Sequence, residues 1–122
     1  MITEDYVSFE VAKLLKEKGF DEPCHCFYGM RDNQEKPHFF VSNGHNTKET
    51  IFSCDCLAPT LQMAMKWLRE VCKQSINLWY DGDIWSSEIY RAVEKEFCLV
   101  GHFQSYEEAC EAAIKYCLEN LI

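Results

Sequence analysis

Cysteines form the sharpest chemical pattern in this chain of 122 residues. The strings CHC (24–26) and CDC (54–56) each hold two thiols at alternate positions. Alternate residues of a strand point to the same side of a sheet, so two antiparallel strands would gather four thiols. The four cysteines are Cys24, Cys26, Cys54 and Cys56, with Cys24 expected opposite Cys56 and Cys26 opposite Cys54. Such a set is suited to zinc, and a nearby histidine is an alternative ligand.

Two other interpretations of these cysteines stay open. The C-x-C spacing is a weaker zinc signal than C-x-x-C, and directly opposed strand positions form a flat rectangle where zinc needs a tetrahedron. Free cysteines are often small buried hydrophobic residues, and a disulfide is a minor option. We therefore predict no cofactor, with zinc as the alternative.

Nothing in the sequence singles out a catalytic residue. The chain has eight cysteines and four histidines, which offer many accidental pairs of nucleophile and base. Glycine-rich phosphate loops, G-x-S-x-G elbows and H-E-x-x-H helices are absent. We predict a protein that is not an enzyme.

Four aromatic residues fall largely outside the helical and strand positions expected to be buried. They are Trp67, Trp79, Trp85 and Tyr90. An exposed aromatic patch in an acidic surface suits a protein partner. The alternative is a sheet covered on both faces, which would bury them all.

Charge and composition narrow the class of partner. The net charge is −8, which repels nucleic-acid phosphates and anionic lipid head groups. The first residues lack the pattern of a secretory signal, and no apolar stretch approaches the roughly 18 residues that span a bilayer. We expect a cytoplasmic protein with reduced thiols that binds neither nucleic acid nor membrane.

Three helices are predicted from apolar periodicity and capping residues. Ser8 begins a helix that ends before Gly19, Pro59 precedes a second helix, and Ser105 with Glu108 forms a capping box for the last. The strings KLLKE (13–17) and KWLRE (66–70) hint at a duplicated α-β-β unit, although amphipathic helices share such strings by chance.

Between the helices the pattern favours strands. These cover 24–30, 38–42, 76–80 and 84–96, of which 84–96 also fits a helix, and 97–103 is a further β-rich run. We expect a turn over 31–36 and a loop over 43–50, and residues 50–56 fit a strand or an extended connection. The prediction is a single α+β domain over 1–122, in the order α-β-β-α-β-β-α, with one mostly antiparallel sheet of about four strands.

Two helical strings resemble a known family. APTLQMAMKWLRE (58–70) and SYEEACEAAIKYCLENLI (105–122) are similar to small uncharacterised proteins from Bacteroides-type gut bacteria, their phages and mobile elements. The resemblance implies a genomic context and no chemistry, and it covers few of the cysteines.

The leading functional hypothesis is a small non-enzymatic accessory protein that acts through protein–protein interaction. Its partner is unidentified, and a second copy of the chain is one candidate. One alternative is a zinc-binding domain built on the two C-x-C pairs. The other is an acidic nucleic-acid mimic that inhibits a host enzyme, which requires acids gathered on one face.

Overall fold

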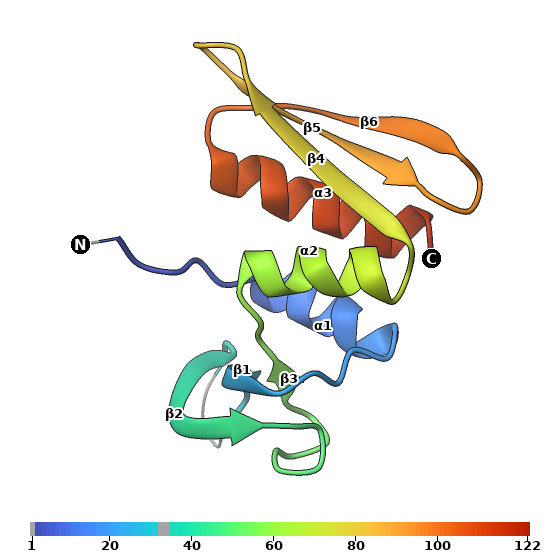
Figure 1. Cartoon of the computed structure of the whole chain (residues 1–122). Coiled ribbons are helices and arrows are strands. Elements are labelled where there is room, and N and C mark those ends of the chain that lie inside the picture. The colour runs from blue at the N-terminus through green and yellow to red at the C-terminus, as the bar shows by residue number, and fades with distance from the viewer. Residues whose placement is uncertain (1, 32–34) are drawn as a thin grey trace. The chain divides into compact units, whose positions relative to one another are not determined.

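The computed structural model describes residues 2–31 and 35–122, which form three helices and six strands (Figure 1). In chain order these are α1 (Phe9–Glu17), β1 (Cys24–Gly29), β2 (His38–Asn46), β3 (Cys56–Leu57), α2 (Leu61–Glu70), β4 (Gln74–Tyr80), β5 (Trp85–Arg91), β6 (Glu96–Phe103) and α3 (Tyr106–Asn120). The predicted α+β class is confirmed. Of the turn predicted over 31–36, residues 32–34 lie outside the described residues.

The chain divides into two compact units, Met1–Thr60 and Leu61–Ile122. Each unit has its own antiparallel three-stranded sheet, with strand order β2-β1-β3 in the first and β4-β5-β6 in the second. The prediction of one sheet of about four strands is therefore wrong, and the order is α-β-β-β-α-β-β-β-α. Each strand pairs with a neighbour in its own half of the chain, because short connections favour such pairs. That the chain is a single domain stays a prediction.

Helix α1 begins and ends as its sequence predicts. The Ser8 hydroxyl accepts a hydrogen bond from the Val11 amide at 3.2 Å. Gly19 has a φ of 91°, and the next amide, that of Phe20, donates back to the Leu15 carbonyl at 3.0 Å. This is a Schellman ending, which needs a residue that tolerates positive φ.

In the first sheet, β1 is the central strand. It pairs with β2 through Phe27 and Phe40, whose rings stack at 5.2 Å. The loop predicted over 43–50 begins later than expected, because β2 continues to Asn46. The Asn46 side-chain amide donates to the Cys24 and His25 carbonyls, which lets a polar segment remain in the sheet.

In the second unit, α3 lies along one face of the sheet β4-β5-β6 (Figure 1). The Ser105 hydroxyl caps it by accepting from the Glu108 amide at 3.1 Å, while the Glu108 carboxylate accepts from Gln104 instead of Ser105. The ambiguous segment 84–96 supplies strand β5, followed by a turn. Ile89 of β5 is fully buried.

Both units begin with the element order α-β-β-β, to which the second unit adds α3, but their sheets differ in topology. The first strand is central in one sheet and the second strand is central in the other. The similarity of KLLKE and KWLRE is thus not accompanied by a shared sheet topology.

No helix among the described residues is both long enough and apolar enough to cross a membrane.

Candidate functional site

The four cysteines of the C-x-C pairs do not adopt the predicted register. Cys56 pairs with Tyr28 across β1 and β3, and Cys26 pairs with Val41 of β2. The expected pairs of Cys24 with Cys56 and of Cys26 with Cys54 are therefore wrong. The observed register brings the segment before β3 alongside Gly29, where the Asp55 carboxylate occupies the space that a side chain would fill.

The thiols of these cysteines have different surroundings. Cys24, Cys26 and Cys56 are buried, whereas Cys54 is exposed. Burial raises the pKa of the Cys24 thiol to about 12, with smaller contributions from Cys26 and Glu22. Burial likewise raises the pKa of Cys56. Both thiols are protonated at neutral pH, and a protonated thiol is a poor nucleophile.

Among residues 2–31 and 35–122, no group of three or more His, Cys, Asp or Glu side chains is placed to hold a metal ion. Two histidines do meet: the rings of His25 and His45 stand edge to face at 4.2 Å, and His25 Nδ1 lies 3.2 Å from the Gly44 carbonyl oxygen. Among the described residues, no third His, Cys, Asp or Glu is placed to complete a metal-binding group with this pair.

The four aromatic residues of the predicted patch separate into two sets. Trp67 is buried in α2, and Trp85 packs against Tyr106 of α3 with ring centroids 5.1 Å apart. Trp79 and Tyr90 lie on the opposite face of the second sheet, as the strand register requires. Two of the four thus share a face, and the other two lie elsewhere.

That opposite face is formed by three rows of cross-strand neighbours, which we call the open face. From β4 through β5 to β6, the rows are Trp79, Ser86 and His102; Asn77, Glu88 and Leu99; and Ser75, Tyr90 and Phe97. Helix α3 covers the other side of the same sheet (Figure 1). Within the second unit, no helix covers the open face.

A bulge decides which side chains of β6 reach the open face. Ser87 pairs with Gly101 and Glu88 with Leu99, so Val100 has no partner. The extra residue reverses the alternation of side chains, so His102 joins the open face. Phe103, at the end of β6, then pairs with Trp85 on the helix-facing side.

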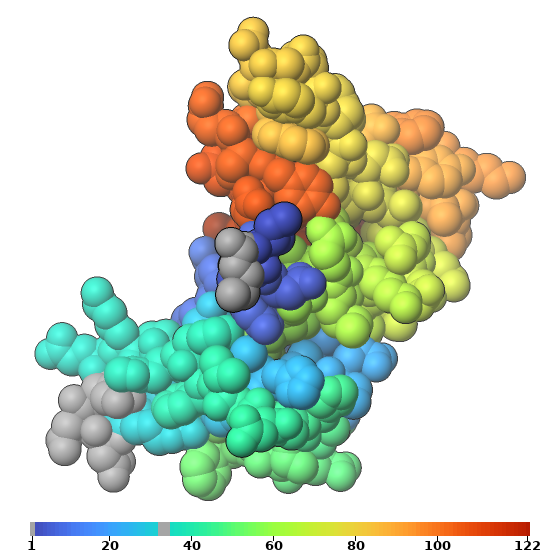
Figure 2. Space-filling model, turned by 60° about the vertical axis from the view of Figure 1, so that its left-hand side comes forward, coloured from blue at the N-terminus to red at the C-terminus, as the bar shows by residue number. Residues whose placement is uncertain are grey.

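The open face combines exposed apolar side chains with polar pairs. Trp79, Leu99 and Phe97 are 42%, 59% and 67% exposed. Tyr90 and Phe97 are in ring contact, with centroids 4.8 Å apart. The tip of the β4–β5 hairpin, gold in Figure 2, projects beyond the rest of its unit.

The polar pairs on this face do not form a hydrolytic site. The Ser86 hydroxyl and His102 Nδ1 are 2.7 Å apart, which resembles a nucleophile and its base. Ser86, however, is only 2% exposed, and in the described part of the chain no carboxylate is hydrogen-bonded to His102. An attacking serine needs access to substrate, and the burial of Ser86 denies it that access.

Sequence reasoning missed Phe97, Leu99 and His102 of the open face. Their alternation in FCLVGHF was visible, but the bulge that regroups them was not.

A second arrangement, also missed, centres on Asp55 in the first unit. This carboxylate is 1% exposed and accepts hydrogen bonds from Arg31 Nη1 at 3.1 Å and from the Phe52 amide at 3.1 Å. The Arg31 guanidinium also lies 4.5 Å from the centroid of the Phe40 ring. The Arg31 side chain thereby connects the segment after β1 with β2 and with the segment before β3.

Comparison of the chain with models of protein families, with curated proteins and with solved structures gives no match.

Proposed function

We propose that this protein is a small non-enzymatic accessory protein of the cytoplasm that binds another protein through the open face. The observation that carries the proposal is that Trp79 on β4 and Leu99 and Phe97 on β6 are all exposed on one sheet surface that no helix of the second unit covers. Single exposed apolar residues are ordinary, but several on one face are typical of interaction sites. Its two helical strings further suggest membership of the small proteins from Bacteroides-type bacteria, phages and mobile elements that they resemble.

The chemistry of the face also specifies its partner. Glu88 is half-buried in the middle row, where its carboxylate accepts from the Asn77 amide at 3.4 Å. A docked surface would remove the remaining water, which is costly for a carboxylate without a cationic partner. The expected partner therefore presents apolar side chains around a lysine or arginine that faces Glu88.

A second copy of this chain fits the face less well. Symmetric docking about the middle row would bring two Glu88 carboxylates together, and directly opposed like charges are destabilising. We therefore favour a different protein with a basic side chain.

The test is affinity capture by the full chain, compared with the double variant Phe97→Ser, Leu99→Ser. Loss of these two apolar side chains from the open face should reduce recovery of the specific partner about tenfold or more. The matched control is Val41→Ser, Val71→Ser, which removes two comparably exposed apolar side chains outside the face. Equal losses in both variants would contradict the proposal.

A zero-length carbodiimide cross-linker, which joins a carboxylate to an amine in direct contact, locates the partner's cation. We expect a cross-link from Glu88 to a partner lysine that Glu88→Gln abolishes. A cross-link only between two copies of this chain would instead establish the homodimer.

A further inference from the structure

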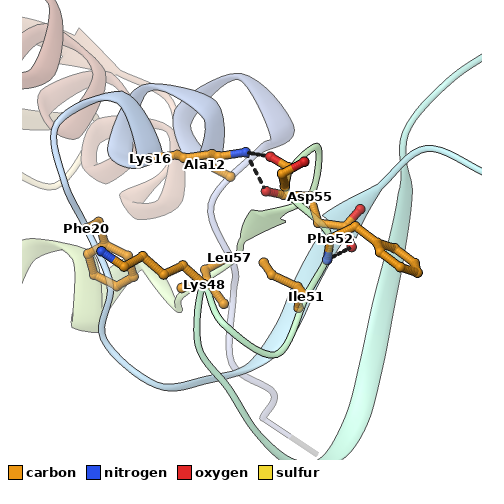
Figure 3. Close-up of a pocket in the computed structure, with 9 residues that line it drawn as sticks. Ala12, Lys16, Phe20, Lys48, Ile51, Phe52, Asp55 and Leu57 are labelled. Carbon is orange, nitrogen blue, oxygen red and sulfur yellow. Dashed lines mark hydrogen bonds between the residues drawn. The ribbon is translucent and has the colours of Figure 1, made fainter.

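The first unit contains a cavity of about 240 Å³ between α1 and residues 48–57 (Figure 3). It is lined by Ala12, Lys16, Phe20, Lys48, Ile51, Phe52, Ser53, Asp55 and Leu57. All of these residues belong to one compact unit, so the cavity does not depend on the second unit.

The helical wall of the cavity follows from the sequence of α1. Ala12 and Lys16 are four residues apart and therefore share a helix face. The Schellman ending at Gly19 then turns Phe20 back toward the last turn of the helix, where its amide bonds to Leu15. The small side chain of Ala12 leaves space that a larger residue would fill.

The opposite wall is held by hydrogen bonds. The Lys16 ammonium donates to the backbone carbonyls of Ser53 and Asp55, the latter at 2.9 Å. Within residues 48–57, the Phe52 amide donates to the Asp55 carboxylate at 3.1 Å, as Figure 3 shows. The Lys16 bonds tie residues 53–55 to α1, and the Phe52 bond closes a turn within the same wall, so the cavity is largely pre-formed.

The charge at the cavity is positive, in a chain whose net charge is −8. Lys16 bonds to neutral carbonyl oxygens, which leave its charge uncompensated. Lys48 pairs with Asp21 at 3.8 Å, and the two side chains are 70% and 35% exposed, so this ion pair is weak. The Asp55 carboxylate is compensated by Arg31 at 3.1 Å.

We propose that this cavity binds a small organic carboxylate with an apolar body. In Figure 3 the Lys16 ammonium lies beside Asp55 and the Lys48 ammonium beside Phe20, so each offers its positive charge to the carboxylate at its own side of the cavity. The apolar side chains of Ala12, Phe20, Ile51 and Leu57 match the body. The cavity of about 240 Å³ is smaller than the roughly 300–1,000 Å³ of pockets that hold drug-sized ligands, which suits a medium-chain acid.

Calorimetric titration of the full chain with sodium octanoate at low salt tests the assignment. We expect one binding event for octanoate. Acetate lacks the apolar body and 1-octanol lacks the carboxylate, so each should bind at least about tenfold more weakly. Absence of octanoate binding, or equal binding of octanol, would overturn the proposal.

The double variant Lys16→Met, Lys48→Met should weaken octanoate binding about fivefold or more. Lys13→Met, Lys66→Met changes the net charge equally at two exposed lysines outside the cavity and should bind as the parent does. Indistinguishable affinities of the two variants would refute the role of the cavity lysines.

The open-face variant Phe97→Ser, Leu99→Ser should retain octanoate binding, since its substitutions lie in the other unit. Loss of binding in this variant would instead place octanoate on the open face. The cavity assignment can therefore fail without affecting the proposed protein partner, and the reverse also holds.

Discussion

At the scale of single residues, the buried Asp55 carboxylate is compensated from several directions. The Arg31 guanidinium, the Phe52 amide and the Cys54 thiol all lie within hydrogen-bonding distance of its oxygens. Burying a carboxylate is expensive, and donors at these positions offset the cost. Gly29 completes the arrangement by leaving room for the carboxylate beside β1.

Gly29→Ala should destabilise the protein by about 1–3 kcal/mol. A methyl group there would lie 2.5 Å from Asp55 Oδ1 and 2.6 Å from Arg31 Nη1, so the ion pair would have to move. Urea denaturation measures the change. Gly44→Ala is the control, because a methyl group there meets no atom within 4 Å. Equal stabilities of the two variants would show that the pair tolerates displacement.

The Cys117 thiol should make stability fall at alkaline pH. Burial, followed by the nearby Cys72, raises the pKa of Cys117 from its ordinary value of 9.0 to about 12. Between these values the unfolded chain releases the proton and the folded chain keeps it, so the free energy of unfolding decreases as pH rises. The stabilisation is complete below about pH 9 and is lost toward pH 12.

The measurement is urea denaturation of the parent and of Cys117→Ala from pH 8 to pH 10.5. The variant is less stable throughout because it leaves a cavity, but its slope above pH 9 should be shallower by about 1.4 kcal/mol per pH unit. Lysines and tyrosines titrate in both proteins and cancel in the comparison. Parallel slopes would show that Cys117 ionises normally in the fold.

At the scale of elements, caps and bulges decide where side chains point. Ser105 sets the start of α3, whose buried side includes Ala113, Ile114 and Cys117. The bulge at Val100 sets which side chains of β6 join the open face. Both are local backbone features with effects across the second unit.

Ser105→Ala should lower the free energy of unfolding by about 1 kcal/mol, since the Glu108 amide loses its acceptor. Ser105→Asp provides the comparison, because aspartate caps a helix as well as serine does and should leave stability nearly unchanged. Thermal unfolding followed by circular dichroism measures both. A similar loss in the aspartate variant would mean that the hydroxyl acts through something other than the cap.

At the scale of the whole molecule, two units each fold around their own sheet. The formal net charge of −8 disfavours phosphate backbones as partners, whereas the open face and the lysine-lined cavity are local departures from the average surface. Each feature belongs to a single unit, so each can be altered separately.

Native mass spectrometry of protein purified without chelator should give the mass of the chain with eight free thiols and no zinc. The basis is that the described residues bring together no group of three metal ligands and that the eight cysteines are unpaired. Comparison with the denatured mass provides the control. A zinc-sized increment that chelation removes would restore the zinc hypothesis for Cys24, Cys26, Cys54 and Cys56.

The sequence alone determined the features that depend on neighbours along the chain. Ser8, Gly19 and Ser105 delimit helices because capping uses donors and acceptors a few residues away. The α+β class followed from the same local periodicities. The division of the strands into two sheets could not be predicted in this way. A strand shows the same alternation of side chains whichever strand it pairs with, so the alternation does not identify its neighbour.

Only the tertiary structure decided the register and what depends on it. Cys56 meets Tyr28 and not Cys24, a choice associated with the space at Gly29 for Asp55. The open face depends on a bulge, and the cavity on contacts between α1 and a segment far along the chain. Such contacts form through packing between distant residues, and no local pattern in the sequence encodes them.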